Sequence, residues 1–156
     1  MLKPTKILAP TDFSKHADKA IREAFELAKE YKAEIYVLHV VDEKIGSLQH
    51  DYSDVSVSHI AVRRRQRRLL RLARIKLDKQ IERLAPPEGI KVIREVELGT
   101  PYEEIIRFQK EKGIDLVVIS SLGTTGLAKY FIGGVARNVL KSTTCPVLLT
   151  KGNGVD

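Results

Sequence analysis

The stretch from Ser120 to Thr150 decides the fold, and it reads SSLGTTGLAKYFIGGVARNVLKSTTCPVLLT. A glycine-bearing loop in it joins a strand-like run to a short helix, which leads into a second apolar run. The run before the loop, Leu116 to Ile119, is short and rich in β-branched residues, so it indicates an interior parallel strand. Ligands bind at the carboxyl ends of such strands, where glycine lets backbone approach phosphate. Gly133 and Gly134 open a helix there, so the layout favours a site for an anion or a nucleotide.

The glycines of this loop form neither of the two common nucleotide motifs. Gly123 and Gly126 do not give the Rossmann pattern G-x-G-x-x-G, and the spacing after Gly123 does not give the Walker pattern G-x-x-x-x-G-K-[ST]. A loop with a few glycines beside a helix is more often ordinary turn chemistry than a ligand site. The loop by itself therefore leaves both interpretations open.

Length and composition bound the class of protein. A chain of 156 residues corresponds to about one domain, and we expect a single domain over residues 1–156. The one cysteine, Cys145, allows no disulfide within the chain, which fits a reducing, cytoplasmic setting. No apolar stretch approaches the length of a signal peptide or a membrane span, so we expect no membrane partner.

The net charge of +7 is concentrated in one segment. The run RRRQRR at residues 63–68 is followed by Arg71, Arg74, Lys76 and Lys79, inside a helix predicted for residues 59–85. One buried stripe is predicted on this helix, formed by Val62, Leu69, Ala73, Leu77 and Leu84. The leading interpretation is a solvated basic face, and the alternative is nucleic-acid binding. No aromatic residue interleaves the arginines, so any such binding would be electrostatic and sensitive to salt.

Strand-like and helix-like segments alternate along the chain. The patterns predict strands at residues 6–9, 34–41, 91–98, 116–119 and 146–150, and helices at about 15–31, 59–85, 101–112 and 135–142. Thr100, Pro101 and Glu103 form a capping box that starts the third of these helices, and Gly113 suits its end. Residues 42–58 show no clear period. Such alternation predicts a doubly wound α/β fold, with an open parallel sheet and helices on both faces.

Five stretches then resemble one family in order along essentially the whole chain: KILAPTDFS, LHVVDE, ELGTPYEEII, DLVVIS and CPVLLT. The family is that of the universal stress proteins. The resemblance implies a five-stranded sheet of order 3-2-1-4-5, adenine nucleotide alpha hydrolase-like, and a homodimer joined through the last strand, Pro146 to Thr150. An apolar strand at a sheet edge also favours such pairing, because it would otherwise stay exposed. The resemblance further implies a role in the stress response. It also implies ATP as a ligand, with Mg as a possible companion ion.

The ATP-binding branch of the family carries G-x-x-G, nine residues, and then G-[ST]. Here that frame falls on Ser120 and Gly123, and then on Gly133 and Gly134. Ser120 places a side chain where the family has glycine, and Gly134 lacks a hydroxyl that would contact phosphate. The N–H groups of Gly133, Gly134 and Val135 can still hold an anion. We expect weakened ATP binding, because each lost charge-assisted hydrogen bond costs about 1.5 to 3 kcal/mol.

Other family positions match more closely. Asp12 stands where the family has a carboxylate facing ribose or adenine, and Val41 where the backbone meets the adenine edge. Asp12 is equally suited to cap a helix, and Thr124 is suited to contact phosphate or to cap its loop. The cofactor-binding residues that we expect are Pro10, Thr11, Asp12, Val41, Ser120, Gly123, Thr124, Gly126, Gly133, Gly134 and Val135.

No catalytic centre can be assembled from the sequence. The four histidines, His16, His39, His50 and His59, show no paired spacing for a metal and none lies beside a nucleophile motif. His39 is better explained as a hydrogen-bonded core residue. We therefore expect no enzyme, and at most very slow ATP hydrolysis.

Three functions remain open. The leading hypothesis is a small cytoplasmic stress-response regulator that binds an adenine nucleotide and signals through its dimer and an unknown protein partner. The second is a family member that does not bind ATP and acts as a protein-interaction module. The third is a basic helix that binds RNA or DNA, and nucleic acid is the least favoured partner of the three.

Overall fold

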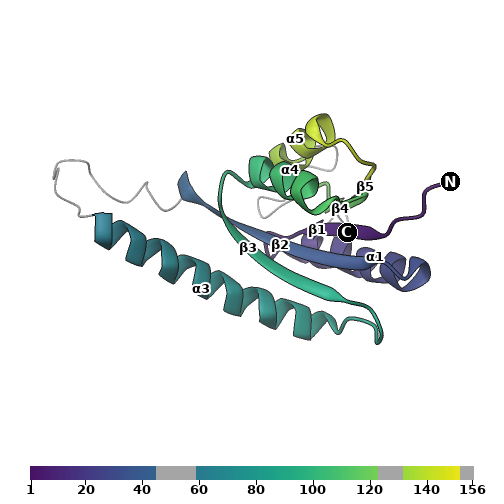
Figure 1. Ribbon diagram of the computed structural model, residues 1–156, viewed down its shortest axis with the longest axis horizontal. Coiled ribbons are helices and arrows are strands. Elements are labelled where there is room, and N and C mark those ends of the chain that lie inside the picture. Colours follow the sequence, from purple (N-terminus) through teal and green to yellow (C-terminus); the bar gives the residue numbers. More distant parts are fainter. Residues whose placement is uncertain (45–58, 123–131, 152–156) are drawn as a thin grey trace, which may run out of the picture.

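The computed structural model describes residues 1–44, 59–122 and 132–151. These residues form five strands and four helices that alternate along the chain (Figure 1). In chain order they are β1 (Lys6–Pro10), α1 (Lys15–Tyr31), β2 (Glu34–Asp42), α3 (His59–Leu84), β3 (Val92–Gly99), α4 (Pro101–Lys112), β4 (Leu116–Ser120), α5 (Gly134–Ser142) and β5 (Val147–Thr150). The predicted elements are thus confirmed, with ends that shift by at most one residue.

The five strands form one parallel sheet of order β3-β2-β1-β4-β5, as predicted. From β1 the chain adds β2 and β3 on one side and then returns to add β4 and β5 on the other. The carboxyl ends of β1 and β4 therefore lead into connections that leave in opposite directions. In open α/β sheets this switch point is where a crevice for a ligand forms.

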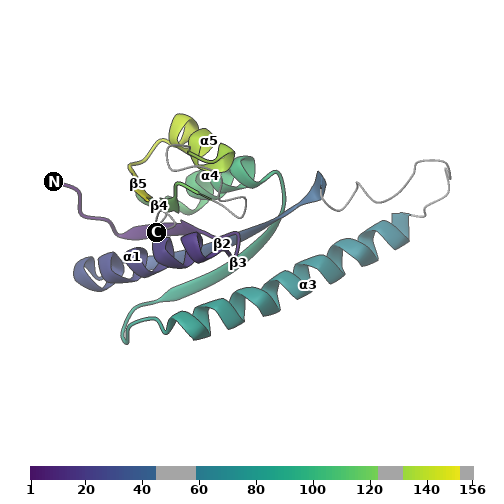
Figure 2. The ribbon, with the colours of Figure 1, turned by 180° about the vertical axis from the view of Figure 1, so that it is seen from behind.

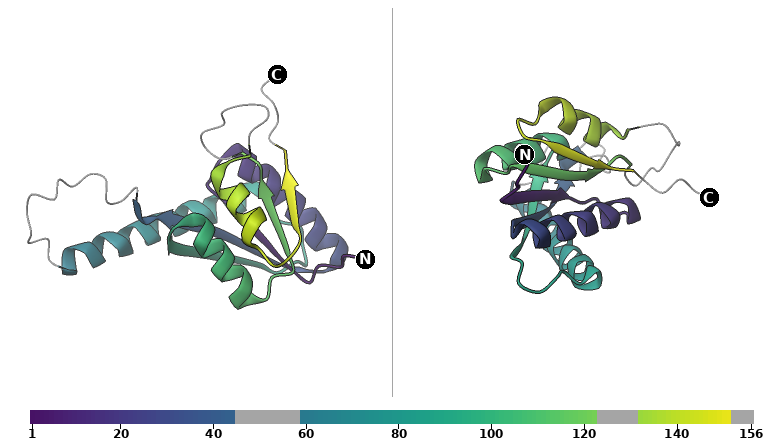
Figure 3. Two further views of the ribbon diagram at one scale, coloured as in Figure 1. Left: turned by 90° about the horizontal axis from the view of Figure 1, so that it is seen from above. Right: turned by 90° about the vertical axis from the view of Figure 1, so that its right-hand side faces the viewer.

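Alternate residues of each strand face opposite helical layers. Ile7 and Ala9 of β1 pack in a core shared with α1 and α3, whereas Leu8 between them packs in a core shared with α4 and α5. Figure 3 shows the resulting three layers, with the sheet between the two helical pairs. Burial on both faces explains the almost continuous apolar run of the central strands, and it confirms the predicted doubly wound fold.

The helix starts agree with the sequence, except in one detail of α4. Thr100 lies at the N-cap of α4 and Pro101 at its first position, but the Thr100 side chain makes no capping hydrogen bond. The predicted capping box is therefore wrong. Glu103, its other half, is exposed and accepts a hydrogen bond from the Tyr102 hydroxyl at 3.1 Å, so a local partner replaces the cap. Gly113 ends α4 in the left-handed conformation at φ 64°, as predicted.

The two halves of α3 differ in their packing. The predicted buried stripe is correct for Ala73, Leu77 and Leu84, and Leu69 is half-buried. It is wrong for Val62, which is 43% exposed. Figure 2 gives the reason, because the first turns of α3 run past the ends of β2 and β3 and have no sheet to cover.

Candidate functional site

A cavity of about 590 Å³ opens at the carboxyl ends of β1, β2 and β4. Most of its wall is apolar, with side chains from β2, β4, α3 and α4. Polar groups enter from the turn after β1, the end of β4 and the start of α5. Its size falls within the range of about 300 to 1,000 Å³ that is usual for small-molecule sites. The cavity lies at the switch point of the sheet, where the topology places a ligand.

The structure gathers most of the predicted cofactor-binding residues around this cavity. The lining includes Pro10, Thr11, Asp12, Val41, Ser120, Gly133, Gly134 and Val135. The remaining three, Gly123, Thr124 and Gly126, lie outside the described residues. That any of these residues contacts a ligand stays a prediction, but residues from four segments of the sequence do share one wall.

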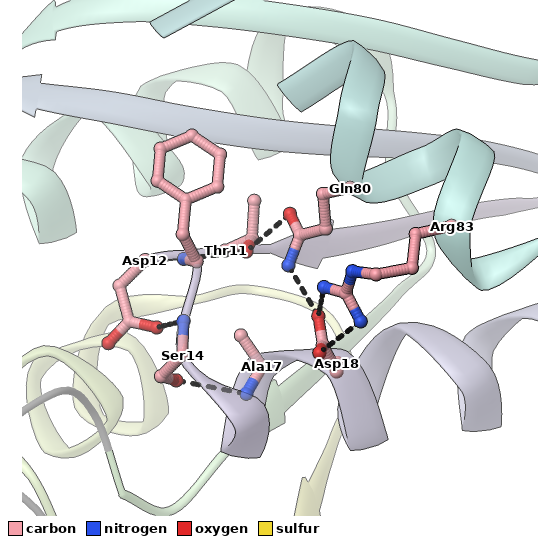
Figure 4. A network of polar contacts seen from close by, with 8 residues as sticks. Thr11, Asp12, Ser14, Ala17, Asp18, Gln80 and Arg83 are labelled. Carbon is pink, nitrogen blue, oxygen red and sulfur yellow. Dashed lines mark hydrogen bonds and ion pairs between the residues drawn. The ribbon is translucent and has the colours of Figure 1, made fainter. Parts of the chain in front are cut away.

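The turn after β1 is held in place by its own polar groups (Figure 4). The Asp12 carboxylate accepts a hydrogen bond from the Ser14 N–H at 2.9 Å. Ser14 is the N-cap of α1, and its hydroxyl accepts the N–H of Ala17 at 3.1 Å. The helix is therefore capped by Ser14. Of the two roles suggested for Asp12, helix capping is thus wrong and ligand contact stays a prediction. Between them, Phe13 has a left-handed backbone at φ 66°.

Thr11 links this turn to the rest of the fold. Its N–H donates to the carbonyl of Leu38 in β2 at 2.8 Å, and its hydroxyl oxygen accepts the N–H of Phe13 at 3.0 Å. The same hydroxyl donates to Oε1 of Gln80 in α3 at 3.0 Å. These bonds join the cavity wall to β2 on one side and to α3 on the other. They also explain how the uncommon backbone of Phe13 is maintained.

Behind Thr11 lies a buried polar network that continues into α1 and α3 (Figure 4). Gln80 donates through Nε2 to Oδ1 of Asp18 at 2.7 Å, and Arg83 contacts both carboxylate oxygens of Asp18 at 3.0 and 2.9 Å. Burial pushes the pKa of Asp18 upward, but the hydrogen bonds from Arg83 and Gln80 outweigh burial, so the net pKa lies below its ordinary value. Asp18 is thus a charged anchor that fixes α3 against α1.

His39 lies beside the same turn. Its Nδ1 is 2.8 Å from the carbonyl oxygen of Thr11, and since a carbonyl only accepts, Nδ1 is the protonated nitrogen. The ring packs on Phe13 with centroids 4.1 Å apart, and Nζ of Lys76 lies 4.6 Å from the Phe13 ring centroid. Burial lowers the pKa of His39 in spite of the hydrogen bond to Thr11, so the ring is neutral at pH 7. The hydrogen bond is as predicted, although His39 is half-buried and also lines the cavity.

The N-terminus of α5 faces the cavity with backbone amides. Gly133 is the N-cap and offers no side chain, and its own N–H donates to the carbonyl of Ser121 at 2.7 Å. The prediction that the Gly133 N–H is available to an anion is therefore wrong. Gly134 and Val135 begin the first turn, and no described residue accepts their N–H groups. Such amides, with the helix dipole behind them, attract negative charge.

Ser120, the first departure from the family pattern, is 8% exposed at the end of β4. Its hydroxyl oxygen accepts the N–H of Leu122 at 3.2 Å, so it takes part in a local turn. The next residue, Ser121, donates its N–H to the carbonyl of Thr150 in β5 at 2.9 Å. The extra side chain of Ser120 is therefore accommodated within its own loop.

The cavity also includes residues that sequence reasoning missed. Arg65 and Leu69 enter from α3, and Pro101 and Ile105 from α4. Pro101 is the second residue after the end of β3, so its place at the same edge of the sheet could have been inferred. Nothing in the sequence distinguishes Arg65 from the arginines around it, because that requires the register of α3 on the sheet.

The described residues give no sign of a metal centre or a membrane span. Among the described residues, no group of three or more His, Cys, Asp or Glu side chains is placed to hold a metal ion. Over the same residues, no helix combines the length and the apolar character needed to cross a membrane.

Comparison with known proteins gives a consistent result. The model of the Universal stress protein family matches residues 4–151. Universal stress protein MJ0531 of Methanocaldococcus jannaschii is 34% identical over 147 residues, which cover 94% of this chain and 81% of the relative. Universal stress protein MJ0577 of the same organism is 32% identical, over 94% of both chains.

Solved structures agree in fold. The structure of MJ0577 superimposes with a TM-score of 0.81 at 29% identity, over 99% of this chain and 100% of that one. A universal stress protein in complex with cAMP (TM-score 0.61, 16% identity, 96% and 98% covered) shares the fold, as does one from Archaeoglobus fulgidus in complex with dAMP (0.54, 18%, 95% and 98%). At those identities the last two show a common fold and no more.

Proposed function

Because this chain belongs to the universal stress protein family, we propose that it is a regulatory protein that binds an adenine nucleotide in the cavity at the carboxyl ends of β1, β2 and β4. One observation carries the proposal: residues predicted separately, from four segments of the sequence, line the same cavity. The cAMP and dAMP complexes of two proteins of this fold support an adenine nucleotide as the class of ligand. The nucleotide acts as a signal here and is at most slowly hydrolysed.

The wall suggests how such a ligand would lie. The base occupies the apolar part, against the end of β2 at Val41, where backbone groups can bond the adenine edge. The carboxylate of Asp12 accepts hydrogen bonds from the ribose hydroxyls. Phosphate lies at the start of α5, where Gly134 and Val135 offer N–H groups. Apolar binding of a base and amide binding of phosphate are thus separated along one cavity.

We propose ATP as the nucleotide, with Mg²⁺ bound mainly through the phosphates. Mg²⁺ usually keeps several waters and takes one or two carboxylates together with substrate phosphates. The described part of the cavity fits that mode, since Asp12 and Asp42 line it and no larger group of metal ligands is present there.

Calorimetric titration with Mg-ATP tests the proposal. The protein is first stripped of bound nucleotide, and wild type is compared with Asp12→Ala and with Glu26→Ala, which removes an exposed carboxylate from α1 outside the cavity. Micromolar binding that is lost in Asp12→Ala and kept in Glu26→Ala supports the site. No heat up to millimolar ATP, together with an unchanged melting temperature, would reject ATP as the ligand.

A gain of function sharpens this test. Gly134→Ser restores the hydroxyl of the family pattern, and a Cβ at position 134 would meet no heavy atom within 4 Å. One added charge-assisted hydrogen bond is worth about 1.5 to 3 kcal/mol, so ATP should bind about tenfold or more tightly. Adenosine has no phosphate to contact and should bind equally to both proteins. An equal gain for adenosine would place the phosphate elsewhere.

The second candidate function is a module of this family that does not bind ATP and acts through protein contacts. The departures at Ser120 and Gly134 favour it. The titration separates the two, because this candidate predicts no nucleotide binding by wild type or by Gly134→Ser.

We also propose a homodimer formed through β5. This strand lies at the edge of the sheet, and its Leu148 is 40% exposed. An edge strand offers unpaired backbone groups, and pairing with a second copy would satisfy them. Sedimentation at micromolar concentration should show a dimer that Leu148→Lys weakens, and a wild-type monomer would contradict the proposal.

A further inference from the structure

The N-terminal half of α3, residues 59–72, buries no side chain. Every buried residue of the helix lies between Ala73 and Leu84. These first 14 residues are about 21 Å long, and Figure 2 shows that the helix starts beyond the ends of β2 and β3. A helix in a globular protein is normally stabilised by an apolar face packed on the core. In this half only Arg65 and Leu69 reach the cavity wall and no side chain is buried, so most of its surface is open to a partner outside the fold.

The same half carries six exposed arginines: Arg63, Arg64, Arg65, Arg67, Arg68 and Arg71. None of them forms an ion pair with a described residue. The first carboxylate along α3 is Asp78, and it is already bound to Arg74 and Arg94. Like charges four residues apart, as in Arg64 and Arg68, destabilise a helix. A bound polyanion would remove this repulsion, which is the first indication of the partner's chemistry.

The arrangement of the arginines indicates which polyanion. A helix advances 1.5 Å and turns about 100° per residue, so Arg63 to Arg71 spans about 12 Å and the six side chains cover an arc of about 200°. This is about one positive charge per 2 Å of helix. Duplex DNA carries one negative charge per about 1.7 Å of its axis. The two linear charge densities nearly match.

The wide arc disfavours flat or one-sided partners. A membrane surface or a single acidic peptide touches one side of a helix, and an interfacial helix needs a separate apolar face. Of the exposed apolar residues of α3, Ile60, Leu72 and Ile75 lie within the arginine arc, and Val62 lies outside it by itself. They therefore form no separate apolar face. The major groove of B-DNA, about 12 Å wide, admits a helix and has phosphates on both flanks. The major groove of duplex RNA is too deep and narrow for this.

We propose that the N-terminal half of α3 docks in the major groove of duplex DNA and binds its phosphates without reading sequence. The half that binds is a rigid continuation of a helix whose other half is packed in the core, so the arginines are presented on a fixed support. The sequence alone favoured a solvated face because the buried stripe was predicted to begin at Val62. Its start at Ala73 leaves this half with no buried side chain, although Arg65 and Leu69 line the cavity.

The test is fluorescence anisotropy of a labelled duplex DNA of mixed sequence with the full chain, from about 50 to about 200 mM salt. The first variant combines Arg64→Gln, Arg67→Gln and Arg68→Gln. The control combines Lys3→Gln, Lys29→Gln and Lys110→Gln, which removes the same charge from exposed positions outside α3. Each lost phosphate contact lowers the slope of log affinity against log salt by about 1, so the slope should fall by about 3.

We expect the arginine variant to bind at least tenfold more weakly and the control to bind like wild type. Lysine at the same three arginine positions should keep most of the affinity, which separates lost charge from lost folding. Equal weakening by the control would overturn the proposal, as would an absence of binding by wild type. Tighter binding of poly-glutamate, of duplex RNA or of anionic vesicles at equal salt would also overturn it.

Discussion

The two halves of α3 are one continuous helix, yet they belong to different environments. In residues 73–84, Leu77 and Ile81 pack in the core, and Gln80 and Arg83 belong to the polar network behind the cavity. Residues 59–72 bury nothing. The packed half is therefore stabilised by buried contacts with the fold. The arginine half has no buried contact and is stabilised mainly by its own backbone hydrogen bonds and, as proposed, by a partner.

This difference separates stability from recognition within one element. Substitutions in the packed half change contacts that hold the sheet and the turn bearing Asp12. Substitutions at exposed arginines outside the cavity wall, such as Arg64, change charge without removing a buried contact. Pairs of identical residues, one from each half, let this comparison be tested directly.

The largest difference is expected between two leucines. Leu77 is 0% exposed and Leu72 is 51% exposed on the same helix. Leu77→Ala removes buried apolar contacts and leaves a cavity, and it should lower the free energy of unfolding by about 2 to 5 kcal/mol. Leu72→Ala should change it by less than about 0.5 kcal/mol. Unfolding in denaturant measures both, and a similar loss in the two variants would mean that the arginine half is packed.

A smaller contrast is expected between two glutamines. Gln80 is 4% exposed and bonds Thr11 and Asp18, whereas Gln66 lies in the arginine half. Gln80→Ala leaves buried polar groups without partners, which costs about 1 to 3 kcal/mol. Gln66→Ala should cost almost nothing, because alanine favours a helix.

Gln80→Ala should also weaken nucleotide binding, because Thr11 then loses its contact with α3 and the turn bearing Asp12 is held less firmly. Denaturant unfolding and Mg-ATP titration of both glutamine variants measure the two effects. Lost stability with unchanged affinity would show that the network supports the core and does not position the turn.

The contrast within α3 also shows why sequence reasoning succeeded for the fold. Strand order and layers follow from regular alternation of apolar runs with amphipathic segments, a pattern set by local residues such as Leu116 to Ile119. The exposure of Val62 could not be predicted in this way, since helical periodicity continues past the point where the sheet ends. Where the sheet ends depends on the lengths of strands distant in sequence.

The position of the site could be predicted from the sequence, but the polar network that supports it could not. The topology and the family pattern brought Asp12, Val41 and Gly134 to one edge of the sheet, and the structure places them around one cavity. The network of Thr11, Gln80 and Asp18 was not predicted. Its members are 62 to 69 residues apart in the pairs that involve Gln80, and only the register of α3 against α1 and β1 brings them together.

The contacts of the packed half with Asp18 should make the stability of the protein depend on pH, whereas the arginine half should not. The pKa of Asp18 is lower in the folded protein than its ordinary value, because hydrogen bonds from Arg83 and Gln80 outweigh burial. The unfolded chain thus binds protons first as pH falls. The stabilisation by Asp18 is complete above about pH 5 and is lost as pH falls through the folded pKa. Asp18→Asn should be less stable at pH 7, and its stability should decline less below pH 5.

Thermal unfolding of wild type and Asp18→Asn across pH 3 to 7 measures this effect, and the comparison cancels the contribution of His39. The lowered pKa of His39 removes stability in both proteins as pH falls through its unfolded value near 6.5, so only the difference between wild type and Asp18→Asn reports on Asp18. The arginines of the other half stay charged throughout and add nothing to it. Parallel curves below pH 5 would contradict the role given to Asp18.

The smallest effect, with the opposite sign, is expected from Arg64→Glu. The new carboxylate would stand four residues before Arg68 and near the positive end of the helix dipole, so repulsion becomes attraction. The gain should be about 0.2 to 1 kcal/mol, or roughly 0.5 to 4 °C in melting temperature. Arg83→Glu, in the packed half, should lower the melting temperature, because it places a carboxylate against Asp18. A loss of stability in Arg64→Glu would mean that Arg64 already has an anionic partner within the protein, and that the arginine half is not free to receive one from outside.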